Sequence, residues 1–156
     1  SQKDCYSHVV VTVDLKGLPD GPHGFHVHEK PLQDCGEEDV MSCCDKLGGH
    51  FNVGPKWSLE NGTGRRHGPG EFGHNGDLCN NIVVYKGRCE LSFTNNCVSL
   101  YHDDPRCVVG RSIVIHEGED DMGLVNYDDE KKNIDKYITG NAGKRIACGN
   151  IELVKT

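Results

Sequence analysis

The 156-residue chain has few aromatic residues, no long apolar run and little helical periodicity. Aromatic side chains make up 6 % of the residues. Nothing approaches the ~18 consecutive apolar residues of a membrane-spanning helix, so no membrane association is predicted. Basic residues are also scarce, because 17 Lys and Arg stand against 24 Asp and Glu and give a formal charge of −7. Phosphate contacts need a basic face, so nucleic-acid binding is excluded too.

Glycine, in contrast, is abundant, and its 20 residues help to separate short runs that predict β-strands. The run 8–15 (HVVVTVDL) is rich in β-branched residues, and the run 25–28 (FHVH) alternates in polarity. Several short strands between turn residues predict an all-β sandwich or barrel. The length predicts a single domain over residues 1–156. Further strands are predicted over 82–85, 89–93, 98–101, 108–117 and 146–154.

Two long segments, 29–80 and 117–144, lack the strand pattern. Loops longer than ~12–15 residues in a compact domain are usually functional or disordered. The best helical candidate, 128–137, is so charged that we expect a solvated surface segment instead. The first segment holds four candidate metal ligands, so a bound metal would explain how it is ordered.

Three histidines lie on predicted strands. His26 and His28 are two residues apart, so both side chains point to the same face of a strand and can reach one ion. His116 ends the apolar run 113–115. Taken singly, each could equally be an ordinary strand histidine.

A second group of candidate ligands lies on a glycine-rich loop. His67 and His74 stand on either side of a Gly-Pro-Gly turn, and Asp77 follows three residues after His74. Imidazole and carboxylate ligands suit zinc. A chance loop composition is the alternative.

His50 lies between the two groups, in the sequence GGHFN. An imidazole has two ring nitrogens, and a deprotonated ring can bind one metal through each, so His50 could be shared. The count then gives each of two metals four protein ligands. Copper would be bound by His26, His28, His50 and His116, and zinc by His50, His67, His74 and Asp77.

Six stretches of the chain resemble the eukaryotic copper/zinc superoxide dismutases. The similarity runs from about Gln2 to Glu152. It implies a Greek-key β-barrel or sandwich of the immunoglobulin-like class, with a long metal-binding loop and a long electrostatic loop. The stretches are GFHVHE (24–29), GHFN (49–52), HNGD (74–77), GRSIVIHE (110–117), DDMG (120–123) and TGNAGKRIACG (139–149).

The resemblance implies three further roles at the site. Arg145 matches the arginine that attracts and orients the anion beside copper. Thr139 matches a threonine that narrows the channel. Asp120 matches the carboxylate that links a copper histidine to a zinc histidine, in keeping with the hydrogen-bonded partners that ligand imidazoles usually have. We expect Lys144 and the loop lysines to add positive charge, the latter being Lys131, Lys132 and Lys136.

Other residues take structural roles under the same resemblance. Cys35 and Cys148 match the disulfide within one subunit. His23 matches a structural histidine, and we expect His8 and His102 to lie on the surface.

The implied activity is disproportionation of superoxide into oxygen and hydrogen peroxide. Copper would cycle between two oxidation states, and His50 would take up and return a proton. The implied partners are the superoxide anion, a copper chaperone and a second copy in a homodimer. Two alternatives stay open: a non-catalytic copper/zinc-binding protein on the same fold, and a copper-delivery protein, which usually carries a Cys-x-x-Cys or Cys-x-Cys motif that this sequence lacks.

The chain also departs from the family. The first hairpin has no counterpart, so either the chain is a fragment or another segment covers the exposed strand edge. Residues 30–32 (KPL) replace the aromatic and glycine residues of the family's dimer contact, which weakens the homodimer prediction. The segment from Cys35 to His50 is longer and contains Cys43 and Cys44, which could be reactive, could bind a metal or could simply be additional thiols. Nine cysteines leave at least one unpaired and leave the compartment open. We predict a cytoplasmic protein, with an extracellular one as the alternative.

Overall fold

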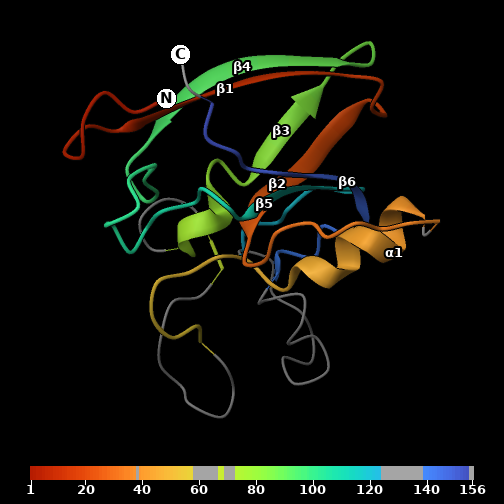
Figure 1. The fold of residues 1–156 in the computed structure, drawn as a ribbon. Helices are drawn as coiled ribbons and strands as arrows, with labels where there is room; N and C mark the ends of the chain where they lie inside the picture. The colour runs from red at the N-terminus through yellow and green to blue at the C-terminus, as the bar shows by residue number, and fades with distance from the viewer. Residues whose placement is uncertain (38, 58–66, 69–72, 124–138, 155–156) are drawn as a thin grey trace.

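The structure is a computed structural model that describes residues 1–37, 39–57, 67–68, 73–123 and 139–154. Within these residues the chain forms six β-strands in two antiparallel sheets, together with a few short helices (Figure 1). No helix in the described part is both long and apolar enough to cross a membrane. The prediction of one domain over residues 1–156 stays a prediction.

The smaller sheet pairs β1 (Val9–Lys16) with β4 (Arg88–Asn95). The register runs from Val9 opposite Asn95 to Lys16 opposite Arg88. Val9 and Val13 are buried while Val10, Thr12 and Asp14 are exposed, which is the period of two expected of a half-buried strand.

The larger sheet has the order β3-β2-β5-β6 and carries most of the site. Its strands are β3 (Asn81–Val84), β2 (Gly21–His28), β5 (Ser112–His116) and β6 (Arg145–Asn150). The first half of β2 pairs with β3, and the second half pairs with β5. These neighbours are far apart in sequence, and the predicted all-β Greek-key class is confirmed.

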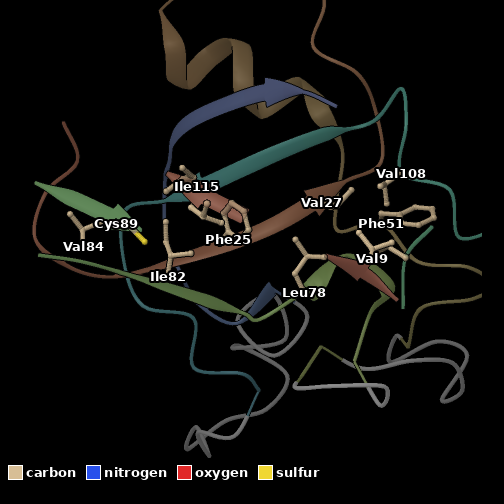
Figure 2. Close-up of a cluster of buried hydrophobic side chains, with 12 residues drawn as sticks. Val9, Phe25, Val27, Phe51, Leu78, Ile82, Val84, Cys89, Val108 and Ile115 are labelled. Carbon is tan, nitrogen blue, oxygen red and sulfur yellow. The ribbon is translucent and has the colours of Figure 1, made fainter. Parts of the chain in front are cut away.

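The core consists of apolar side chains from both sheets (Figure 2). Phe25 and Val27 of β2 lie on the buried face together with Ile115 of β5 and Ile82 of β3. His26 and His28 alternate with Phe25 and Val27, so they project from the opposite face of the sheet. Core packing on one face therefore fixes where the two imidazoles stand on the other.

A short helical segment interrupts the region that we expected to lack regular structure. It consists of α1 (Val40–Cys44) followed by the 3-10 helix η1 (Asp45–Leu47). The Asp39 carboxylate caps α1 by accepting a hydrogen bond from the Ser42 amide at 2.8 Å. Figure 1 shows α1 beside β6, and Cys44 and Leu47 are fully buried against Val114. The helix is too short to show an apolar periodicity in the sequence.

The disulfide predicted between Cys35 and Cys148 is wrong. Cys148 of β6 pairs with Cys44, and Cys35 pairs with Cys43. Adjacent residues of a helix point about 100° apart, so Cys44 faces β6 while Cys43 faces the preceding loop. Helix α1 therefore gives the two adjacent cysteines different partners.

Most other strand predictions agree with the structure to within a few residues. Residues 98–101 form no strand and contribute only an isolated bridge from Ser99 to Cys107. The charged segment 128–137 lies outside the described residues.

The edge of β1 is partly covered by the first residues of the chain. The Ser1 ammonium donates to the Val10 carbonyl at 2.7 Å, and the Val10 amide donates to the Ser1 carbonyl at 2.7 Å. The Gln2 side chain accepts a hydrogen bond from the Leu100 amide at 2.7 Å. These first residues therefore cover the beginning of this edge.

Candidate metal centre

Four buried histidines meet at one end of the larger sheet. Sheet register places His26 opposite Val114 and His28 opposite Ser112, while an isolated bridge joins His28 to His50. The ring centroids of His26 and His50 are 4.1 Å apart, and those of His28 and His50 are 5.0 Å apart. We call the set His26, His28, His50 and His116 the strand group.

Each ring of the strand group is held through one nitrogen. His28 Nδ1 donates to the Gly48 carbonyl at 2.9 Å, and His116 Nδ1 donates to the Gly143 carbonyl at 3.0 Å. The other two rings are held by carboxylates, through hydrogen bonds from His26 Nε2 to Asp120 at 2.5 Å and from His50 Nδ1 to Asp77 at 3.0 Å.

The second nitrogen of each ring has no hydrogen-bond partner among the described residues. A buried polar atom without a partner is destabilising, so such atoms are rare in native proteins. Four of them in one cluster fit a metal ion, which would accept their lone pairs. The atoms are His26 Nδ1, His28 Nε2, His50 Nε2 and His116 Nε2.

Burial also sets the protonation of three rings of this group, those of His28, His50 and His116. It lowers the pKa of His28 to about 2 and that of His116 to about 4. Burial and the neighbouring His26 hold the pKa of His50 well below its usual value. These rings are therefore neutral at pH 7, which is the form that binds metals.

Asp77 is the centre of a second set of contacts. It lies in the 3-10 helix η3 (Asn75–Asp77), and its Oδ1 accepts hydrogen bonds from His50 Nδ1 and His67 Nδ1, both at 3.0 Å. Its Oδ2 accepts from the amides of His74 at 2.9 Å and Gly68 at 3.2 Å. Burial alone would raise the pKa of Asp77, but the hydrogen bonds from the histidines lower it well below the usual range. We call the set His50, His67, His74 and Asp77 the loop group.

Asp120 lies between the two groups. Besides His26, its carboxylate accepts a hydrogen bond from His67 Nε2 at 2.7 Å. Burial would lower the pKa of His67, but the bonds to Asp120 and Asp77 outweigh it and raise the pKa to about 9. Gly140 has φ +80° and packs so closely on Asp120 and His67 that a Cβ atom would clash with both. Glycine at this position thus permits the contact.

The ligand atoms form two groups that could each hold an ion. In the first, the atoms of the strand group lie within 4.8 Å of one another, the membership predicted for copper. The second group consists of His26, His50, His67 and Asp77. It differs from the zinc prediction, because His26 takes the place of His74. His74 Nδ1 lies 3.6 Å from Asp77 Oδ1.

His50 belongs to both groups. One of its nitrogens faces the carboxylate of Asp77, and the other is the unpartnered Nε2 in the strand group. The all-imidazole group suits copper, whereas the group with a carboxylate suits zinc.

Arg145 lies at the start of β6, beside the strand group. Its Nη1 donates to the Cys44 carbonyl and its Nη2 to the Gly48 carbonyl, both at 2.8 Å. The Gly48 oxygen also accepts the hydrogen bond from His28, so the guanidinium and the imidazole of His28, a member of the strand group, share one acceptor. Thr139 and Lys144 are exposed. The loop lysines 131, 132 and 136 lie outside the described residues.

The three remaining histidines lie where the sequence predicted. His23 is buried, and its ring contacts the carbonyl oxygens of His116 at 2.8 Å and Pro19 at 2.7 Å. His8 and His102 are exposed.

Sequence reasoning missed the backbone oxygens that hold the site. The carbonyls of Cys44, Gly48 and Gly143 orient Arg145, His28 and His116, and main-chain acceptors leave no signal in residue type. A signal for Cys44 did exist. Neighbouring cysteines rarely bridge each other, so Cys43 and Cys44 need separate partners.

Comparison with known proteins agrees with this geometry. The family model for copper/zinc superoxide dismutase (SODC) matches residues 1–151. The chain belongs to this family. Together with the two donor groups, family membership fits copper and zinc as the cofactors.

Three curated relatives carry superoxide dismutase names. The chain is 39 % identical over 151 residues to the extracellular superoxide dismutase [Cu-Zn] of Drosophila melanogaster, which covers 97 % of this chain and 71 % of that protein. It is 37 % identical over 154 residues to superoxide dismutase [Cu-Zn] 5 of Dictyostelium discoideum, covering 99 % and 87 %. It is 36 % identical over 144 residues to a putative superoxide dismutase [Cu-Zn] of Autographa californica nuclear polyhedrosis virus, covering 90 % and 80 %.

A solved structure shares the fold. The crystal structure of the clock protein EA4 superposes with a TM-score of 0.71 at 33 % identity, covering 94 % of this chain and 80 % of that one.

Proposed function

We propose that this protein is a superoxide dismutase that converts superoxide into oxygen and hydrogen peroxide. The observation that carries the proposal is the set of four unpartnered ring nitrogens, all buried in one cluster beside Arg145. In this proposal the strand group holds copper and the loop group holds zinc. Copper, when bound, supplies the one-electron chemistry, whereas zinc is redox-inert.

His50 is the residue that couples the two groups. Asp77 fixes the ring through Nδ1, so Nε2 keeps a defined direction within the strand group. Nε2 is the atom at which His50 would hold a proton and pass it to the forming peroxide.

Arg145 is the residue that attracts the substrate. Two of its N–H groups are bound by backbone oxygens, which hold the guanidinium in place while its other N–H groups remain for an anion. The charge of the whole chain is negative, so capture of superoxide depends on this local positive field. Thr139 narrows the approach in the same proposal.

The test combines metal analysis with a superoxide-decay assay. Protein loaded with copper and zinc should accelerate decay, lose this activity when copper is removed, and regain it when copper but not zinc is added. A fully loaded protein that does not accelerate decay is a metal-binding protein without this activity, and the proposal is then wrong.

Replacing Arg145 tests the substrate step alone. Arg145→Ala should lower the rate by about tenfold and weaken its dependence on ionic strength, because local charge sets the capture rate. Copper content should not change. Unaltered kinetics in the metal-loaded variant would refute the role of Arg145.

We also propose that the protein works in an oxidising compartment, outside the cell. Nothing supports the cytoplasmic prediction. Two disulfides are unusual in a reducing cytosol, and one relative is named as extracellular. Native protein extracted with a thiol-blocking reagent should carry both disulfides. A homodimer and supply by a copper chaperone stay predictions.

A further inference from the structure

The short helix η1 brings an acidic side chain next to Arg145. The two carbonyls that bind the guanidinium, Cys44 and Gly48, are the residues on either side of η1. The helix thus surrounds one edge of the guanidinium, and its first residue is Asp45. Asp45 Oδ1 lies 4.0 Å from Arg145 Nε.

The position of Asp45 is fixed by its backbone. Leu47, two residues on, is fully buried in the cluster with Cys44 and Val114. The disulfide from Cys44 to Cys148 ties the other end of η1 to β6. Asp45 is 70 % exposed, so its carboxylate extends from an anchored backbone into the solvent beside the guanidinium.

The carboxylate affects Arg145 through charge and not through a hydrogen bond. A separation of 4.0 Å is too long for a hydrogen bond, so Asp45 itself leaves the Nε–H group open to a ligand. An anion arriving at this edge nevertheless meets a negative charge. Burial lowers the pKa of Arg145, and Asp45 is the charged group that opposes this shift.

We propose that Asp45 sets how strongly Arg145 attracts anions, by partly neutralising the guanidinium at its solvent-facing edge. The inference rests on the proposed function, in which Arg145 captures superoxide. Asp45 is then a residue that determines affinity, and it weakens the capture that Arg145 alone would provide.

The test compares two substitutions that remove the same charge. Asp45→Asn removes the carboxylate beside Arg145. Glu37→Gln removes another exposed carboxylate from the same segment of the chain, which follows β2. Both are made in the copper- and zinc-loaded protein. The rate of superoxide decay is measured at several ionic strengths. Binding of inorganic phosphate is followed in the reduced, diamagnetic protein through the NMR signal of the Arg145 Nε–H group.

Asp45→Asn should raise both the rate at low salt and the phosphate affinity by about two- to fivefold. This is the effect expected from removing one solvent-exposed unit charge about 4 Å from the guanidinium. Glu37→Gln should leave both close to the parent values. The gain in rate should vanish when Arg145 is already replaced by alanine. Equal effects of the two substitutions would overturn the proposal, because only overall charge would then matter. If the parent protein has no dismutase activity, the proposed function fails, while the phosphate titration still decides the role of Asp45.

Discussion

The strand group and the loop group are built in different ways, although they share His50. In the strand group, His26, His28 and His116 stand on paired strands, and the packing of Phe25 and Val27 on the opposite face fixes their positions. In the loop group, His67 and Asp77 lie on irregular backbone and a single turn of 3-10 helix. Their arrangement depends on hydrogen bonds that converge on one carboxylate.

The difference shows that one fold can position the ligands of two metal sites in two ways, by strand packing and by hydrogen bonds to a carboxylate. The strand group presents four ring nitrogens that have no hydrogen-bond partner among the described residues, so an ion bound by them breaks no hydrogen bond. In the loop group, His50 and His67 each donate through Nδ1 to Asp77 Oδ1, so an ion bound there must replace these hydrogen bonds. We therefore expect the strand group to be the more robust of the two, and the following substitutions test that expectation.

Replacing the shared ligand should have the largest effect. His50→Ala removes a donor from both groups and should lower the rate of superoxide decay by more than about 100-fold. Loss of a residue that only hydrogen-bonds to a metal ligand already lowers metal affinity or activity by about 10–100-fold. Copper and zinc contents should both fall on dialysis against a chelator. His102→Ala, at an exposed histidine, is the control. A variant that keeps both ions and the parent rate would show that His50 is not shared.

Replacing Asp77 should separate the two groups. Asp77→Asn keeps the shape but removes the negative charge on which His50 and His67 converge, so zinc affinity should fall by about 10–100-fold. Copper affinity of the strand group should change little. Competition with a chromophoric chelator measures both, and Asp103→Asn is an exposed control. Parallel loss of both ions would contradict the independence of the groups.

Replacing Asp120 should weaken both groups to a smaller extent. Asp120→Asn loses one of the carboxylate oxygens that accept from His26 and His67, and we expect about a tenfold loss in affinity for each ion. The same chelator competition tests this. An effect confined to one ion would show that Asp120 orients only one of the rings.

Of these substitutions, removal of the disulfides should change metal affinity least, but it should lower the free energy of unfolding most. Replacing Cys44 and Cys148 by alanine opens a link across 104 residues, whereas replacing Cys35 and Cys43 opens one across 8. Chain-entropy arguments predict losses of about 4–5 and about 2–3 kcal/mol in the free energy of unfolding. Urea unfolding of the metal-loaded proteins measures both. Equal losses would show that the short link is as important as the long one.

The sequence predicted best where a strand pattern and a ligand pattern coincide. His26 and His28 could be placed on one face because alternation is a property of the strand itself. The contact of His50 with both groups followed from counting donors. The Cys35 pairing failed because a five-residue helix decides which way Cys43 and Cys44 point, and so short a helix has no periodicity to detect. The exchange of His26 for His74 in the second group depends on the contacts of Asp120 and His67, which no local pattern encodes.

The Gly48 carbonyl has a consequence for how this enzyme family member can diverge. One oxygen atom orients His28 and also anchors Arg145. Gly48 has φ +74° and ψ −161°, a conformation that is strained for any other residue, so substitution would displace this backbone. If His28 binds copper and Arg145 captures the anion, as proposed, the two properties cannot evolve independently, because a mutation that shifts this peptide would alter both together.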